Sequence, residues 1–236
     1  TAGTSTGIEI AGFVTAPAGK TAAVTIYKPD GTSLASTSAS TSVSGGFVNL
    51  VNLPTTGTYT VFIDPADVAT ANMRVTLEPG TPLVIDGSST NIVLTTAGET
   101  ARLTFTATAG QNLGLGLSRL TLAPATSTYA TVYVYKPDGV YLTYVPCYVS
   151  NTGCSLNLAN LPATGTYSVV VTPLSGGTGS FTATLSSDVA ATLTAGAAYS
   201  LNLSRVGQNG RLTFGGTAGT NRTLTFASIA TVLAGK

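Results

Sequence analysis

The chain has no histidine and no tryptophan, and its 236 residues include one methionine and two cysteines. Histidine is the most common general base and a principal zinc ligand, so its absence argues against most hydrolytic and zinc-dependent mechanisms. The sequence also lacks a Gly-x-Ser-x-Gly motif and a phosphate-binding loop ahead of a helix. We therefore expect a protein that is not an enzyme, without catalytic residues, cofactor or metal centre.

Charge is scarce as well. Charged residues make up 8% of the chain, and the formal net charge is +1, whereas about 25% is usual for globular proteins. Nucleic acids and acidic membranes are bound by clustered cations, so neither is an expected partner. No apolar run approaches the roughly 18 residues that a membrane-spanning helix needs, so we expect no membrane insertion. A near-neutral surface favours self-association.

Threonine, serine, asparagine and glycine supply most of the polar surface. Threonine suits strands, and glycine suits turns. This composition is typical of secreted β proteins, and we expect an extracellular or cell-surface location. The chain starts without a signal-peptide pattern, which fits a mature chain or a piece of a longer one.

The chain repeats itself. Thr1-Ala2-Gly3 recurs as Thr108-Ala109-Gly110 and as Thr217-Ala218-Gly219. A shift of 108 residues aligns residues 24–63 with 132–171, with 19 of these 40 positions identical. Such a match indicates duplication. The predicted units are module 1 over residues 1–98, module 2 over residues 99–206, and a C-terminal strand segment over residues 207–236.

The hydrophobic period within a module is two residues. Leu113, Leu115 and Leu117 alternate with polar or small residues, as in a strand with one buried face. Residues 132–135 are apolar on both faces, and the turn formed by Pro137, Asp138 and Gly139 follows them. We predict an all-β protein with two tandem β-sandwich modules of jelly-roll or Greek-key type.

The repeat does not begin and end where the chain begins and ends. Residues 102–105 (Arg-Leu-Thr-Phe) precede the second Thr-Ala-Gly copy, and the same four letters at 211–214 precede the third. Nothing precedes the first copy, so we expect module 1 to lack its opening strand. The C-terminal segment carries the spare strand, and the predicted donor residues are Asn209, Gly210, Arg211, Leu212, Thr213 and Phe214.

A missing strand at one end and a spare one at the other predict a structural subunit of an extracellular, pilus-like filament. Each copy would complete the next by donor-strand complementation, so the expected partner is the chain itself, head to tail. The residues after Phe214 exceed what the gap requires. We expect these residues either to provide a second donor strand, Thr223 to Phe226, or to pack on module 2. The alternative function is a stalk or binding module of a larger secreted repeat protein, including one that binds carbohydrate.

Three segments of module 2 carry a family resemblance. Ala130 to Gly139, Leu161 to Val169 and Gly179 to Leu185 resemble the strands and turns of bacterial pre-peptidase C-terminal (PPC) domains. The resemblance implies secreted β-sandwiches that occur in tandem in surface proteins or are appended to hydrolases. It does not imply catalysis.

Cys147 and Cys154 flank a short turn-forming loop, which fits either a hairpin disulfide or two partly buried thiols. In a secreted protein the disulfide is the prediction. The equivalent residues in module 1 are Ala39 and Gly46, so the fold does not require the bond.

Acidic residues are few and scattered. Asp30 and Asp138 occupy matching turns, where we expect them to bind their own backbone rather than calcium, which needs six or more oxygen ligands. A denser group is either merely solvated or a weak cation site: Asp64, Asp67, Glu78 and Asp86.

Most tyrosines occupy equivalent positions in the two modules and are expected in or near the cores. Tyr141, Tyr144 and Tyr148 have no aromatic counterpart in module 1 and lie beside the cysteine loop. They form the predicted contact loop for a glycan or another surface ligand.

Overall fold

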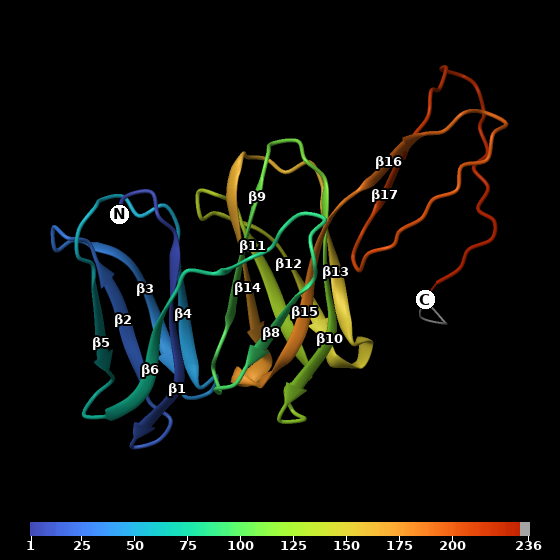
Figure 1. The fold of residues 1–236 in the computed structure, drawn as a ribbon. Helices are drawn as coiled ribbons and strands as arrows, with labels where there is room; N and C mark the ends of the chain where they lie inside the picture. Colours follow the sequence, from blue (N-terminus) through green and yellow to red (C-terminus); the bar gives the residue numbers. More distant parts are fainter. Residues whose placement is uncertain (232–236) are drawn as a thin grey trace.

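The computed structural model describes residues 1–231, which fold into strands β1 to β17 and two single 3₁₀ turns, η1 (Val149–Asn151) and η2 (Leu174–Gly176). Two β-sandwiches lie side by side, and an extended tail follows them (Figure 1). Within this range, no helix has the length and apolar character to cross a membrane. The predicted all-β fold class with two sandwich modules is confirmed.

Module 1 contains a six-stranded antiparallel sheet in the order β5-β2-β3-β4-β1-β6. β3 and β4 meet at one residue pair, Ser40 and Gly45, so the sheet folds over between them. The two resulting layers, β5-β2-β3 and β4-β1-β6, enclose a core that includes Ile10, Val24 and Ile26. The strands are β1 (Thr6–Ala16), β2 (Thr21–Tyr27), β3 (Ser33–Ser40), β4 (Gly45–Leu50), β5 (Thr60–Pro65) and β6 (Thr70–Glu78).

Module 2 repeats this plan in a nine-stranded sheet, ordered β7-β9-β14-β11-β12-β13-β10-β15-β8. Its corner is the single pair Tyr148 and Gly153, between β12 and β13. The layers are β7-β9-β14-β11-β12 and β13-β10-β15-β8. The strands are β7 (Thr81–Pro82), β8 (Thr90–Leu94), β9 (Ala101–Ala107), β10 (Leu113–Ala123), β11 (Tyr129–Tyr135), β12 (Tyr141–Tyr148), β13 (Gly153–Leu158), β14 (Gly165–Pro173) and β15 (Thr178–Ser187).

Local sequence explains the strands and their ends. In β11, Ala130, Val132 and Val134 point into the core and the residues between them point outward, which is the period-two pattern. Gly139 closes the following turn with a φ of 82°, a left-handed conformation that suits glycine. Lys136 N donates to Val140 O at 2.9 Å, so the chain reverses directly into β12.

The two modules stack through layers that are not equivalent in the repeat. The β4-β1-β6 layer of module 1 faces the β9-β14-β11-β12 layer of module 2 (Figure 1). β7 and β8 belong to the nine-stranded sheet although they come before residue 98. The predicted boundary between residues 98 and 99 therefore falls after two strands that module 2 includes.

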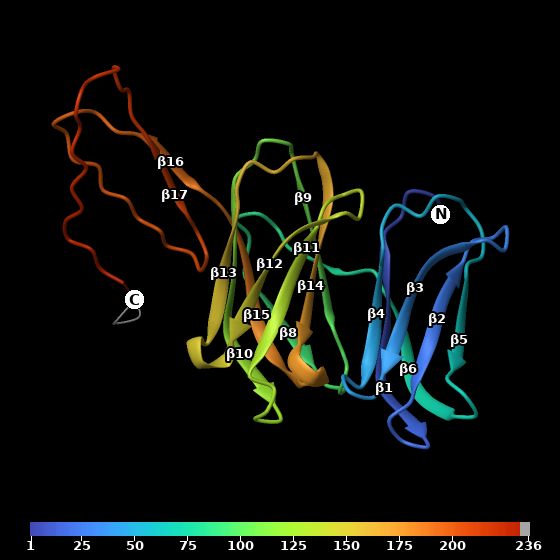
Figure 2. The ribbon, with the colours of Figure 1, turned by 180° about the vertical axis from the view of Figure 1, so that it is seen from behind.

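The tail, residues 188–231, leaves module 2 on the side opposite module 1 (Figure 2). Its β16 (Val189–Thr192) and β17 (Gly210–Thr213) form a parallel two-stranded sheet. Residues 232–236, the end of the predicted C-terminal segment, lie outside the described residues.

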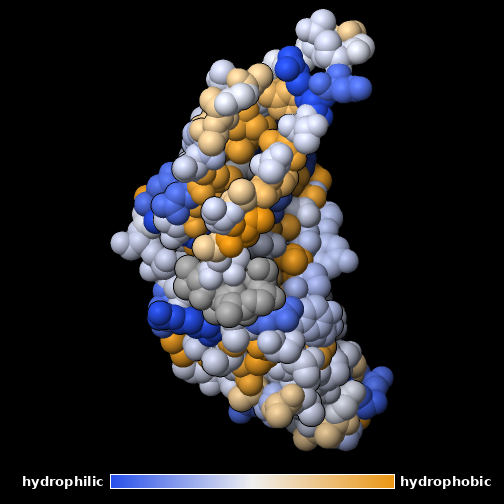
Figure 3. All heavy atoms as spheres, turned by 90° about the vertical axis from the view of Figure 1, so that its right-hand side faces the viewer, coloured by the Kyte–Doolittle hydropathy of each residue, from blue (hydrophilic) through white to orange (hydrophobic). Residues whose placement is uncertain are grey.

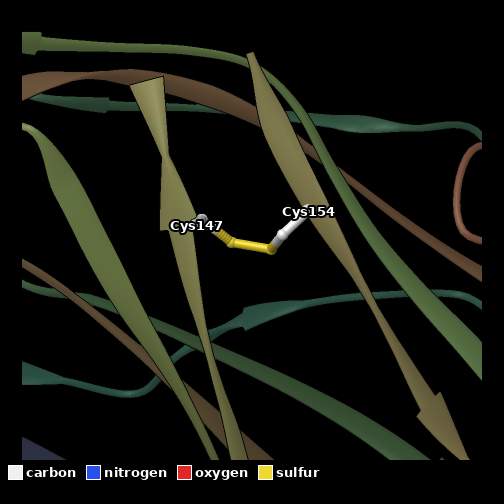
Figure 4. Close-up of a disulfide and its surroundings, with 2 residues drawn as sticks. All are labelled: Cys147 and Cys154. Atoms are coloured by element: carbon white, nitrogen blue, oxygen red, sulfur yellow. A yellow bond between two sulfur atoms is a disulfide. The ribbon is translucent and has the colours of Figure 1, made fainter. Parts of the chain in front are cut away.

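The predicted disulfide is confirmed. Cys147 in β12 and Cys154 in β13 are bonded, with their Cα atoms 4.9 Å apart (Figure 4). The bond joins the two layers of module 2 at the corner where the sheet folds over. In module 1, Ala39 is buried in β3 and Gly46 lies in β4, so the same corner forms there without a covalent link.

We predict that the variant Cys147→Ala/Cys154→Gly, which restores the module 1 residues, still folds but is less stable. A disulfide across so short a loop restricts the unfolded chain by about 2.5 kcal/mol at 25 °C. Urea denaturation should therefore give a lower midpoint for module 2, equal to that of the reduced wild-type protein. An unchanged midpoint would contradict this.

Candidate functional site

The candidate site consists of two unpaired features at opposite ends of the molecule. One is the mouth of module 1, the side of the sandwich opposite its corner, where β5 and β6 end the two layers. The other is the tail. Module 2 shows how the same mouth looks when it is closed, and it serves as the internal reference.

In module 2 the mouth is closed by β8 and β9. β9 pairs with β14, with Leu103 opposite Val169, and β8 pairs with β15, with Ile92 opposite Phe181. Leu103 is fully buried in the core that these strands complete. Both layers of module 2 thus gain strands from the chain that precedes Thr108: β9 and β7 in one layer, and β8 in the other.

In module 1 the mouth is open. Among residues 1–231, β5 and β6 are the edge strands of this sheet, and neither has the outer neighbour that β14 and β15 possess. Within this range, as predicted, no strand takes the place of β9 in module 1, and none takes the place of β8.

Exposed side chains mark this opening. Leu77 in β6 is 64% exposed and Val75 is 44% exposed, whereas their counterparts in β15, Leu185 and Ala183, are 2% and 0% exposed. Val61 and Ile63 of β5 are half-buried, and the equivalent residues of β14 are fully buried. The mouth therefore presents apolar side chains beside two rows of unpaired backbone groups, a combination that favours strand addition.

The tail repeats the sequence that closes module 2. A shift of 109 residues aligns residues 89–105 with residues 198–214. The pairs that match in character are Ile92 with Leu201, Leu94 with Leu203, Gly98 with Gly207, Arg102 with Arg211, Leu103 with Leu212 and Phe105 with Phe214. We call residues 188–214 the C-terminal clasp.

The clasp also repeats the structure. β17 pairs in parallel with β16, just as β9 pairs in parallel with β7. Leu193 N donates to Thr213 O at 2.7 Å, and Leu83 N donates to Thr104 O at the same distance. β9 has a second neighbour in β14, but within residues 1–231 β17 has only β16. The clasp is therefore a preformed closing segment whose outer edge is free.

Apolar side chains of the clasp are exposed where their counterparts are buried. Phe214 is 58% exposed and Leu203 is 44% exposed, whereas Phe105 and Leu94 are 2% and 4% exposed. Figure 3 views the molecule from the tail side, and hydrophobic residues are scattered over this face. Of the predicted donor residues, Leu212 lies in β17 and is half-buried, and the exposed Phe214 follows directly after β17.

The base of the clasp is fixed to module 2. Gly207 and the carbonyl of Val206 lie directly against Gly116 in β10, where a Cβ on Gly116 would collide with them. Arg205 Nε donates to Ser186 Oγ at 2.8 Å, and Gln208 Nε2 donates to Ser187 O at 3.2 Å. The clasp therefore leaves module 2 in a defined direction.

The junction between the modules shows what surrounds such a clasp when it is docked. Arg102 in β9 is buried and donates to Asn49 Oδ1 at 3.0 Å and to Pro79 O at 2.6 Å. Asn49 Nδ2 in turn donates to Ser168 Oγ of β14 at 2.8 Å. Burial among these neutral partners lowers the pKa of Arg102. Polar contacts therefore fix the register of module 2 on module 1.

Glu9 is a buried carboxylate in the same junction. Its Oε2 accepts a hydrogen bond from Thr100 N at 2.9 Å, and its Oε1 accepts one from Arg74 at 3.2 Å. Burial nevertheless raises the pKa of Glu9, because it outweighs these two bonds. The counterpart of Glu9 in module 2 is Gly116, so the tail rests on a surface without this charge.

The remaining tail repeats β1. Thr220 Oγ1 donates to Thr217 O at 2.7 Å, as Thr4 Oγ1 does to Thr1 O. Ser228 has a φ of 54°, and its counterpart Gly12 in β1 has a φ of 62°. Module 1 already contains β1 in this place, between β4 and β6. An acceptor module therefore has no vacancy for the predicted second strand, Thr223 to Phe226.

The predicted contact tyrosines lie together on the outer face of β11 and β12. Tyr144 stacks on Tyr133 with ring centroids 6.1 Å apart, and Tyr148 packs on Tyr129 at 5.5 Å. Tyr141 lies 6.5 Å from Tyr144 and is exposed like the other two. Ser33, Ser36 and Ser40 occupy these three positions in module 1.

The acidic residues do not gather into one site. Asp30 Oδ1 accepts from Thr32 N and Asp138 Oδ1 accepts from Val140 N, both at 2.9 Å, so both serve their own turns. Asp67 pairs with Lys20 at 2.7 Å, and Asp86 accepts from Ser187 N at 2.9 Å. Within residues 1–231, no three His, Cys, Asp or Glu side chains lie close enough to hold a metal ion.

Two parts of the site go beyond the sequence-based prediction. Residues 188–203 belong to the clasp, although the predicted donor began at Asn209. The signal was present in the alignment of Leu201 and Leu203 with Ile92 and Leu94. The contact between Asn49 and Ser168 joins two modules through space, and no local motif marks it.

Similarity to known proteins is found at the level of structure. No protein-family model matches the chain, and no curated protein matches it. Among solved structures, the chain is similar to the pre-peptidase C-terminal domain of a collagenase from Bacillus anthracis, with 13% sequence identity and a TM-score of 0.35. The match covers 45% of this chain and 93% of that domain.

We predict that replacing Tyr144 and Tyr148 by serine, the residue found in module 1, leaves module 2 folded. Each lost cross-strand ring pair should cost no more than about 1 kcal/mol. The matched control is Tyr167→Ser, which empties a buried core position and should cost about 3 kcal/mol or more. If urea denaturation gives the same loss of unfolding free energy for both variants, the exposed tyrosines are structural.

Glu9 should make its own contribution to the pH dependence of stability. Its pKa is raised by folding, so its stabilising contribution is complete below the ordinary value of about 4.3 and is lost as the pH rises through the higher native value. The pKa values of Asp30, Asp67 and Asp138 are lowered by their hydrogen bonds, and these residues contribute with the opposite sign.

The variant Glu9→Gln isolates this contribution, because the three aspartates are common to both proteins. The free energy of unfolding of wild type minus that of Glu9→Gln should decrease between pH 4 and pH 7 in urea titrations. A difference that stays constant or increases with pH would contradict the inferred direction of the Glu9 pKa shift.

Proposed function

We propose that the protein is a structural subunit of an extracellular filament that assembles head to tail by donor-strand complementation. One observation carries the proposal: the chain contains both an open mouth on module 1 and, at the opposite end, a free copy of the segment that closes the mouth of module 2. Each feature lacks what the other supplies.

The internal reference specifies how the clasp would dock on the next copy. Leu103 lies opposite Val169 in the β9–β14 ladder, so Leu212 would lie opposite Val61 of the acceptor. Ile92 lies opposite Phe181 in the β8–β15 ladder, so Leu201 would lie opposite Met73. β17 would thus extend the β5 layer, and residues 199–203 would extend the β6 layer.

Apolar burial and backbone pairing both favour docking. Fully burying one large exposed apolar side chain contributes about 1.5–3 kcal/mol. Leu201, Leu203, Leu212 and Phe214 are already partly buried in the clasp, so roughly half of this value applies to each. The sum, about 3–6 kcal/mol, lies at the lower end of the cost of association, about 4–15 kcal/mol. The backbone hydrogen bonds of two new ladders add to this sum, and β16 already holds β17 extended before docking.

The position of the two features makes the assembly open-ended. The mouth lies on module 1, and the tail projects from the far side of module 2 (Figure 1). Donor and acceptor are different surfaces, so the contact is heterologous, and repeating it gives a filament unless the rotation closes a ring. The disulfide and the low charge agree with an extracellular or cell-surface location.

A second candidate function is a stalk or binding module of a larger secreted repeat protein. The observation that favours it is that the tail continues past the clasp and repeats β1 through Ser228. A further module in the same chain would use that strand, and the clasp would then dock in cis. In this candidate Tyr141, Tyr144 and Tyr148 provide the contact surface for a glycan or another ligand.

We predict that the chain forms filaments visible by electron microscopy and that Phe214→Asp prevents them. The aspartate would have to enter the position that Phe105 fills in module 2, so the concentration needed for assembly should rise at least about 100-fold. Phe226→Asp is the matched control. It places the same charge in the same tail, in the part for which module 1 has no vacancy, and should assemble like wild type.

A tail-less chain provides the complementary test. A variant ending at Ser187 retains every strand of both modules and the open mouth, so it should be monomeric and should shorten wild-type filaments by capping the growing end. A wild-type chain that sediments as a monomer at all concentrations would contradict the filament proposal and favour the stalk. Assembly that is insensitive to loss of the tail would contradict the clasp as donor.

A further inference from the structure

The junction between the modules contains a hydrogen bond whose two partners each have an equivalent in the other module. Asn49 in β4 of module 1 donates from Nδ2 to Ser168 Oγ in β14 of module 2, at 2.8 Å. Ser168 is almost fully buried by this contact surface. The bond connects the outer faces of two stacked layers, so its formation depends on their register.

The repeat assigns an equivalent to each partner. Asn49 pairs with Gly7 of β1, and Asn157 pairs with Gly114 of β10, so the two asparagines occupy the same place in their layers. Ser168 pairs with Tyr135 of β11, and Thr60 pairs with Tyr27 of β2. Threonine retains the hydroxyl that the bond requires. Thr60 is thus the counterpart of Ser168.

Both equivalents are exposed, and Asn157 has a free donor. Asn157 Oδ1 accepts from Asn209 Nδ2 at 3.4 Å. In the described part of the chain, Asn157 Nδ2 donates to no group, whereas Asn49 uses both ends of its amide. The outer face near Thr60 is uncovered: Phe62 is 50% exposed, whereas its counterpart Val170 is 3% exposed beneath module 1.

We propose that Asn157 of one copy donates from Nδ2 to Thr60 Oγ1 of the next copy and that this bond sets the register of assembly. The inference rests on the proposed head-to-tail filament and specifies a contact within it. The β13-β10 face of one copy stacks on the β5-β2 face of the next, as the β4-β1 face stacks on the β9-β14 face inside the chain. Each junction along the filament then repeats the internal one.

A double-mutant cycle on assembly tests the bond. Asn157→Ala and Thr60→Ala should each raise the concentration at half-assembly by about two- to tenfold, as expected for one neutral hydrogen bond. The double variant should resemble either single variant, because the second change removes a bond that is already lost. Light scattering over a dilution series measures these values, and thermal unfolding of each variant verifies that it is folded.

Two matched controls change residues away from the proposed contact between Asn157 and Thr60. Asn151→Ala removes an exposed asparagine in η1, and Ser36→Ala removes a hydroxyl from β3 at a position whose counterpart, Tyr144, is exposed beside the internal junction. Both should assemble like wild type. A double variant whose fold-change equals the product of the two single fold-changes would overturn the Asn157–Thr60 bond.

The outcomes separate this inference from the filament proposal. Suppose that the wild type assembles and the tail-less chain stays monomeric. If the fold-change of the double variant then equals the product of the two single fold-changes, the bond is refuted and the filament proposal is not. If the wild type does not assemble, the filament and the bond are both refuted.

Discussion

The edge of a β-sheet is the constraint on which this structure depends. A strand that ends a layer leaves backbone donors and acceptors unpaired, and in a sandwich it also leaves the core accessible at the mouth. Module 2 meets the constraint with β8 and β9, which cap both layers and complete its core. Module 1 has the same layers without these caps in the described residues, and at its edge strands the smaller core ends in the half-buried residues Val61, Ile63 and Met73. The difference between the modules is therefore one of closure rather than of fold.

The strands that close module 2 come before the other strands of its two layers in the sequence. β8 and β9 precede β10 in the sequence, and the segment that carries them also crosses from one module to the next. The segment from β7 to β9 therefore connects module 2 to module 1 and also completes the core of module 2.

Divergence between the modules separates what the fold needs from what it tolerates. The corner between layers forms with Cys147 and Cys154 in one module and with Ala39 and Gly46 in the other. The outer face carries a row of tyrosines in module 2 and serines at the matching positions in module 1. By contrast, the inward residues of the paired strands remain apolar in both modules, since core packing allows few alternatives. The exposed tyrosines and the disulfide are additions to a fold that forms without them.

The sequence by itself determined the all-β class, the duplication and the disulfide, because each depends on local periodicity or on matching letters. Leu103 and Leu212, for example, occupy identical tetrapeptides. Only the tertiary structure decided that β7 and β8 belong to module 2, that residues 188–203 share in the clasp, and that Asn49 bonds to Ser168. These facts depend on which layers stack and which edges lie adjacent, and such long-range pairings are set by the packing of the whole chain rather than by any local pattern.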